Sequence, residues 1–200
     1  MKLQLLLILT IIVLVSCNSR KKNDPTPVST TPVTETVQPK DPLGQRISTI
    51  EIKLKATKEE LETFEDGVVP WINMEETNKE IIRLIDPDKI VLPYPSVTLI
   101  IDYPLNTPAM VALSTIPQGF TFKQIILEIS KKYHELYALE ESTATTKTVP
   151  MSKRKGLINR NETNGKFGVC CHDLADLVLS SIWVYQNSKG KITLMLEIES

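Results

Sequence analysis

The segment between residues 121 and 141 constrains the fold of this chain more than any other part of the sequence. Its apolar side chains recur at intervals of three and four residues, which places them on one face of a helix; they are Phe122, Ile125, Ile126, Ile129, Tyr133, Leu136 and Tyr137. Thr121 stands directly before this run and can cap the helix. A helix with such an apolar face normally forms part of a core layer, so we predict a long helix that packs on the rest of the domain.

Two shorter helices are predicted before this one. Thr57 and Glu60 have the spacing of a capping box, which opens a helix that we expect to end near Phe64. Asn73 can cap a second helix over residues 74–85, and its apolar stripe would consist of Ile81, Ile82 and Ile85.

The remaining apolar segments indicate strands. Ile50, Ile52 and Leu54 alternate with charged residues, as in a strand with one buried face. Residues 97–101 are almost continuously apolar, which favours a central strand buried on both faces. Apolar residues at 182–185 and 191–198 flank a polar turn and predict a C-terminal β-hairpin. Because helices and strands do not alternate regularly, we predict an α+β fold, with helices packed on a largely antiparallel sheet.

The first seventeen residues bear on location. They contain Lys2, an apolar run shorter than the roughly 20 residues that span a bilayer, and the tripeptide Leu-Val-Ser directly before Cys17. This pattern resembles the signal peptide and lipobox of bacterial lipoproteins. The resemblance implies removal of residues 1–16, acylation of Cys17 (palmitate being one such chain) and retention in the bacterial cell envelope, at the outer membrane if the host has one. The alternative is an ordinary secretory signal cleaved near Cys17.

The composition divides the rest of the chain into a tether and a domain. Residues 18–46 are rich in Pro, Thr, Ser, Val, Lys and Asp and contain no aromatic residue. We therefore expect residues 17–46, which begin with the lipidated Cys17, to form a disordered tether. Residues 47–200 are long enough for one hydrophobic core, and we expect a single α+β domain there.

The charge of the chain argues against a nucleic-acid partner. Lys and Arg number 23 against 24 Asp and Glu, a formal net charge of −1, whereas nucleic-acid-binding domains are basic. One local excess of positive charge is interpreted as a mobile basic loop; the alternative is a contact for an anionic partner. Its basic residues are Lys147, Lys153, Arg154, Lys155 and Arg160.

Small, polar and titratable residues gather between 156 and 179, and we expect functional residues there. The segment contains an Asn-Arg run at 159–160, a Thr-Asn-Gly run at 163–165 and the sequence His-Asp-Leu-Ala-Asp-Leu at 172–177. These runs resemble those of an uncharacterised group of small proteins, which implies a shared fold and carries over no mechanism. Gly168 permits a close approach of the backbone.

His172 is one of two histidines in the chain and the main candidate catalytic residue. Asp173 follows it and Asp176 lies four residues on, so that on a helix His172 and Asp176 would share a face and could hold a metal or act as an acid–base pair. Asp102, at the end of the predicted central strand, is the natural source of a further carboxylate. In the alternative, which we favour, Asp173 caps a helix and Asp176 places negative charge in its first turn.

Cys170 and Cys171 are adjacent in the sequence. Neighbouring Cα atoms lie about 3.8 Å apart, closer than in most disulfides, so we predict buried free thiols. The pair forms no CxxC motif and lacks the four thiolates of a structural zinc site. Two alternatives are a nucleophilic cysteine beside His172 and a disulfide with another chain.

No nucleotide, phosphate or hydrolase motif is present, so we expect no cofactor. Four aromatic residues either line a carbohydrate or peptide groove or pack in the core; they are Trp71, Tyr94, Tyr103 and Phe120. We expect a lipid-anchored envelope protein that acts by non-catalytic binding of an unknown protein or small molecule, or as a structural component. The alternative is a hydrolase or metal-dependent enzyme that uses His172, Asp173, Asp176 and Asp102.

Overall fold

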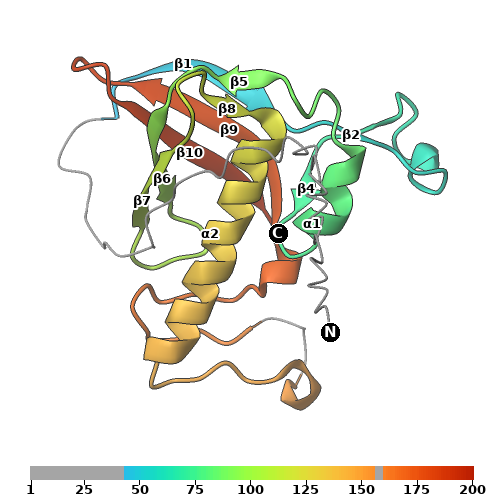
Figure 1. Cartoon of the computed structure of the whole chain (residues 1–200). Helices are drawn as coiled ribbons and strands as arrows, with labels where there is room; N and C mark the ends of the chain where they lie inside the picture. Colours follow the sequence, from blue (N-terminus) through green and yellow to red (C-terminus); the bar gives the residue numbers. More distant parts are fainter. Residues whose placement is uncertain (1–42, 156–159) are drawn as a thin grey trace, which may run out of the picture.

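The computed structural model describes residues 43–155 and 160–200 of the chain (Figure 1). The predicted signal peptide, Cys17 and most of the predicted tether lie outside the described residues. Strand β1 covers Gln45–Glu51. It therefore includes Gln45 and Arg46, which we had assigned to the tether, and the ordered domain begins before residue 47.

The fold is α+β and is built around a six-stranded, mainly antiparallel sheet, as predicted. The strand order is β1-β9-β10-β6-β7, and the short strand β4 also pairs with β9. The pairing of β10 with β6 is parallel. Strands β9 and β10 form the predicted C-terminal hairpin. The bounds of the strands after β1 are Ile72–Asn73 for β4, Ser96–Ile101 for β6, Ala109–Ser114 for β7, Val178–Gln186 for β9 and Ile192–Glu199 for β10.

Strand β6 is the predicted central strand, and it lies inside the sheet between β10 and β7. Leu99 is 0% exposed and the next residue, Ile100, is 4% exposed. Because successive side chains of a strand point to opposite faces, this part of β6 is buried on both faces, as predicted. The middle position in the strand order belongs to β10.

Two small two-stranded sheets accompany the main one. Strand β2 (Leu54–Lys55) pairs with β3 (Val68–Val69), and β5 (Ile90–Leu92) pairs with β8 (Phe120–Thr121). The single strand that we predicted over residues 50–54 is therefore divided between β1 and β2.

Helix α2 covers Phe122–Thr143 and lies across the sheet (Figure 1). Thr121 caps it: the Thr121 hydroxyl accepts from the Gln124 amide at 3.2 Å, and the Gln124 side chain accepts from the Thr121 amide at 2.9 Å. Six of the seven predicted apolar residues are buried, and the seventh, Tyr137, packs partly buried against the core. The long helix is confirmed.

The shorter helices are less extensive than predicted. Thr57 and Glu60 do form the reciprocal hydrogen bonds of a capping box, at 2.7 and 3.3 Å, but the helix behind it is one 3₁₀ turn, η1 (Glu60–Glu62).

The predicted helix over residues 74–85 is replaced by α1 (Thr77–Glu80) and a 3₁₀ turn, η2 (Ile81–Arg83). The chain leaves the helix because the Ile85 amide donates to the Lys53 carbonyl at 3.0 Å, beside the bridge between residues 54 and 84. Ile82 is consequently 85% exposed and belongs to no apolar stripe, which corrects that prediction.

No helix in the described part of the chain is both long and apolar enough to cross a membrane. A further 3₁₀ turn, η3, covers Met151–Lys153. The segments that follow α2 return past its C-terminal half before they enter β9 (Figure 1).

Candidate functional site

The Thr-Asn-Gly run belongs to a loop, residues 163–168, that wraps around the carboxylate of Glu140 near the end of α2. Glu140 is 0% exposed. Its carboxylate accepts hydrogen bonds from the Thr163 hydroxyl (2.7 Å) and from the amides of Gly165 (2.7 Å), Phe167 (2.8 Å) and Gly168 (3.2 Å). A Cβ atom on Gly165 would lie 2.6 Å from the Glu140 carbonyl oxygen, so glycine is required there. The run therefore has a structural role.

The environment of Glu140 has opposing effects on its pKa. Burial raises the pKa, whereas the hydrogen bonds from the Phe167 amide, the Thr163 hydroxyl and the two glycine amides lower it. The hydrogen bonds outweigh burial, and the pKa of Glu140 lies below its usual value. The carboxylate is therefore ionised in the folded domain at neutral pH.

A second loop, residues 102–107, pairs with the end of the 163–168 loop and with Cys170. The amides of Asn106 and Thr107 donate to the Gly168 and Phe167 carbonyls at 2.9 Å each, and the Cys170 amide donates to the Pro104 carbonyl at 3.0 Å. Gly168 has a φ of +66°, and a Cβ atom there would lie 2.9 Å from the Asn106 side chain. The close approach predicted at Gly168 is confirmed.

Cys170 and Cys171 form a disulfide with each other, which we call the vicinal disulfide. The prediction of buried free thiols is wrong on both counts, because the two residues are also half-buried. Cys171 has a φ of +72°, and the His172 amide donates to the Cys170 carbonyl at 2.9 Å. The chain therefore makes a tight turn at Cys171. Our prediction of free thiols assumed the usual Cα spacing of disulfides and did not consider such a turn.

These segments line an open pocket of about 290 Å³. It is lined by Asp102, Tyr103, Pro104, Leu105, Asn106, Cys170, Cys171 and His172. The rings of Tyr103 and His172 lie side by side in it, with centroids 5.6 Å apart and planes tilted by 39°. The pocket thus brings together His172 and Asp102, the two residues that we predicted could share a site. The vicinal disulfide also lines it.

Two tyrosines of α2 hold the walls of the pocket. The Tyr133 hydroxyl donates to the Tyr103 carbonyl at 2.9 Å, and the Tyr137 hydroxyl donates to the His172 carbonyl at 3.0 Å. Burial raises the pKa of both phenols. They therefore remain neutral donors over the whole physiological range.

Asp102 and His172 keep their polar groups available to a ligand. Within residues 43–155 and 160–200, no hydrogen bond or ion pair engages the Asp102 carboxylate or the His172 ring nitrogens. Both side chains are half-buried.

Asp173 and Asp176 do not line the pocket. Asp173 is the N-cap residue of a 3₁₀ turn, η4 (Leu174–Asp176), and its amide donates to the Asp176 carboxylate at 2.8 Å. The Asp173 carboxylate also accepts from both terminal nitrogens of Arg154. This arrangement agrees with the alternative in which Asp173 caps a helix, although the helix is a single 3₁₀ turn. His172 lies before that turn, so His172 and Asp176 share no helix face. In the described part of the chain, no three His, Cys, Asp or Glu side chains are grouped as a metal site.

The chain was compared with protein-family models, with curated proteins and with solved structures. No match was found in any of the three comparisons.

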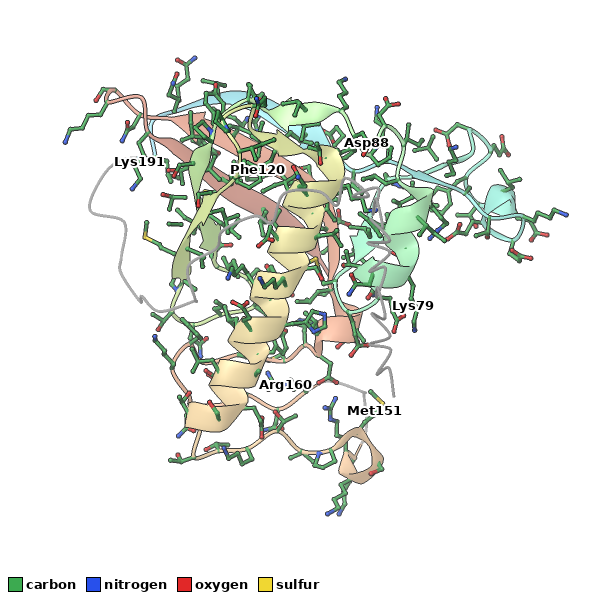
Figure 2. The ribbon with its side chains drawn as sticks, viewed as in Figure 1. Lys79, Asp88, Phe120, Met151, Arg160 and Lys191 are labelled. Atoms are coloured by element: carbon green, nitrogen blue, oxygen red, sulfur yellow. A yellow bond between two sulfur atoms is a disulfide. The ribbon has the colours of Figure 1, made fainter. Side chains whose placement is uncertain are left out.

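The basic segment that follows α2 is only partly a solvent-exposed loop. Arg160 is 5% exposed and lies beside the C-terminal half of α2 (Figure 2). Its guanidinium stands 5.1 Å from the centre of the Tyr137 ring and donates to the Thr148 hydroxyl. Together with Arg154 it contacts Asp173, from which the Arg160 Nε lies 3.8 Å away. These two arginines fasten the segment to Asp173, which follows the pocket residue His172, and this corrects the prediction of a mobile loop at their positions.

Of the four aromatic residues considered as the lining of a carbohydrate or peptide groove, only Tyr103 lines the pocket. Phe120 is 0% exposed, Trp71 makes an edge-to-face contact with Phe64 at 5.2 Å, and Tyr94 packs partly buried against the core. No sequence signal marks Glu140 as an organising residue, because it occurs among polar residues at the end of a helix pattern.

Proposed function

We propose that this chain is a lipid-anchored protein of the bacterial cell envelope whose domain binds a small ligand, without catalysis, at the pocket of Asp102, Tyr103 and His172. The observation that carries the proposal is that Asp102 and His172 present polar groups, unpaired within residues 43–155 and 160–200, to a pocket whose walls are fixed by part-buried hydrogen bonds. Unpaired polar groups in a preformed concave site are what a ligand needs for orientation and specificity.

The surroundings of the two other aspartates favour binding over catalysis. An acid–base mechanism with His172, Asp173 and Asp176 needs these carboxylates free, but Asp173 is paired with Arg154 and Asp176 accepts from the Asp173 amide. A larger depression of about 430 Å³ lies between β1 and β5. The charged side chains that line it are all exposed, so it offers no comparable pair of half-buried polar groups; they are Glu51, Lys53, Asp86 and Lys89.

The lipid anchor is supported by the pattern before Cys17 and is tested by labelling. Cells that express the full-length chain are fed an alkyne analogue of palmitate, and the label and the chain are followed in membrane and soluble fractions. We expect labelling and membrane retention for the wild type and loss of both for Cys17→Ser. The chain has three cysteines, so a variant with serine at 170 and 171 is the matched control and should stay labelled. Equal labelling of Cys17→Ser would overturn the anchor.

The binding site is tested with a fragment library and ¹H–¹⁵N NMR on the full-length chain. We expect the amides that shift to cluster at residues 102–106 and 170–172. Fragment hits that gather only in the depression between β1 and β5 would overturn the assignment of the pocket.

The alternative function, a hydrolase that uses His172 and Asp102, is favoured by one observation: both residues line the same pocket. It is tested with p-nitrophenyl esters, phosphates and glycosides. Hydrolysis that is lost in both His172→Ala and Asp102→Asn, with the fold retained, would replace the binding proposal with this one.

A further inference from the structure

We infer, on the basis of the proposed binding function, that the ligand of this pocket is a single neutral sugar ring of a glycan. The pocket has two adjacent rings, Tyr103 and His172, beside hydrogen-bonding groups that have no partner within the described residues. A pyranose ring also has an apolar and a polar surface. Its C–H face is apolar, and its rim carries hydroxyl groups that both donate and accept.

The apolar part of the lining includes the adjacent rings of Tyr103 and His172. Pro104, Leu105 and the vicinal disulfide belong to it as well. Tyr103 is 36% exposed, although its hydroxyl is tied to Ser200 at 2.8 Å and its carbonyl to Tyr133. A large aromatic ring that is held in place and still open to solvent is suited to stacking against the C–H face of a sugar.

The polar groups beside this surface fit hydroxyl groups. The two oxygens of the unpaired Asp102 carboxylate can accept from two neighbouring hydroxyls of one ring, a charge-assisted arrangement. The Asn106 side-chain nitrogen donates to Glu162 at 2.6 Å, which leaves the Asn106 oxygen as an acceptor. The ring nitrogens of His172 supply a donor and an acceptor.

The size and charge of the pocket narrow the class of ligand. Its volume of about 290 Å³ is just below the range of typical ligand sites, about 300–1,000 Å³. It therefore takes one ring and leaves the rest of a glycan outside. No Lys or Arg is among the lining residues, and the Asp102 carboxylate repels anions, so phosphorylated or acidic ligands are disfavoured. A carboxylate beside an aromatic ring can also hold an organic cation, so the test includes one as a comparator.

The inference is tested by saturation-transfer NMR on the full-length chain in detergent. The probes are the methyl glycosides of glucose, galactose, mannose and N-acetylglucosamine, with tetramethylammonium and inorganic phosphate as comparators. We expect at least one glycoside to bind with a Kd on the order of 1 mM, because few atoms of a single ring can contribute to affinity.

Four variants relate binding to the two surfaces of the pocket. Asp102→Asn removes the charge at constant shape and should weaken glycoside binding by about 10- to 100-fold. Asp88→Asn is its matched control, since Asp88 is exposed and lies at the opposite end of the domain from Arg160 (Figure 2). Arg160 pairs with Cys171, which lines the pocket. Tyr103→Ala should abolish binding, whereas Tyr103→Phe keeps the ring and should retain it.

The outcomes separate this inference from the proposed function. Glycoside binding that needs Asp102 and the Tyr103 ring supports both. Binding of tetramethylammonium or phosphate at the pocket, without any glycoside, overturns the sugar and leaves the binding function standing. Glycoside binding that is indifferent to Asp102→Asn and Tyr103→Ala also overturns the inference. If no probe and no fragment shifts the pocket amides, both proposals fail.

Discussion

Replacing Glu140 by glutamine removes one oxygen atom from the centre of the 163–168 loop and is predicted to destabilise the domain by about 2–4 kcal/mol. One carboxylate oxygen accepts from Thr163 and Gly165, and the other accepts from Phe167 and Gly168. An amide group has a single acceptor oxygen, so in either orientation its NH₂ group faces donors.

The magnitude follows from the two hydrogen bonds that the variant loses. With the amide oxygen towards Thr163 and Gly165, the buried amides of Phe167 and Gly168 have no acceptor. Each unsatisfied buried donor destabilises the folded state by about 1–3 kcal/mol. Part of this loss is offset, because the variant no longer buries a charge. The sum, about 2–4 kcal/mol, is a large fraction of the 5–15 kcal/mol that typically stabilises a domain.

The pH dependence gives an independent readout of the same contact. Because the pKa of Glu140 is lowered on folding, its stabilising effect is fully present above the ordinary glutamate pKa, about 4.5, and is lost as the pH falls through the lower folded value. The wild type should therefore lose stability relative to Glu140→Gln as the pH is lowered from 5 to 3.

The assay is urea unfolding of the two proteins, followed by the fluorescence of the two tryptophans, at a series of pH values. Glu65→Gln is the matched control, because Glu65 is exposed and should change stability by less than about 0.5 kcal/mol. Two results would refute the reasoning. One is a loss of unfolding free energy below about 1 kcal/mol for Glu140→Gln at pH 7. The other is a stability difference between wild type and variant that does not shrink as the pH is lowered.

Three other measurements test the structure. Gly165→Ala should lower the free energy of unfolding by about 2 kcal/mol or more, because its Cβ would meet the carbonyl oxygen of Glu140 at 2.6 Å. In Gly190→Ala the Cβ meets no atom within 4 Å, so this variant should lose stability only through the strain of its φ of +77°, about 1 kcal/mol. Equal losses of stability for the two variants in urea unfolding would contradict this. Mass spectrometry after alkylation should find the vicinal disulfide unlabelled before reduction and carrying two labels afterwards, and a free thiol there would refute it. Ile81→Ala should lower stability by about 2–5 kcal/mol, whereas Ile82→Ala, at a site 85% exposed, should change it by less than about 0.5 kcal/mol.

The elements that the sequence predicted well are those with a long or regular pattern. Helix α2 and the C-terminal hairpin were anticipated because their apolar periodicity extends over many residues and does not depend on a partner elsewhere in the chain. The helix over residues 74–85 failed because a non-local contact decides its end. Ile85 leaves the helix to hydrogen-bond with Lys53, which is 32 residues earlier in the sequence, and no local pattern records that contact.

The candidate site was predicted in part. The sequence named Asp102 and His172, and the structure places both at one pocket. It missed the vicinal disulfide, because the positive φ of Cys171 is a property of the folded backbone that residue type alone does not reveal. It also missed the pairing of Asp173 with the arginines, whose side chains appeared only as a run of positive charge.

The polar contacts of α2 explain how this pocket is assembled. Tyr133, Tyr137 and Glu140 lie four and three residues apart, so they occupy one face of the C-terminal half of the helix. Tyr133 binds the 102–107 loop, Tyr137 binds the His172 carbonyl, and Glu140 binds the 163–168 loop. Each contact is a buried or half-buried hydrogen bond to a different segment. The helix that was most evident in the sequence is therefore also the element that sets the relative positions of the three segments around the pocket, and damage to this face should alter ligand binding without any change in a lining residue.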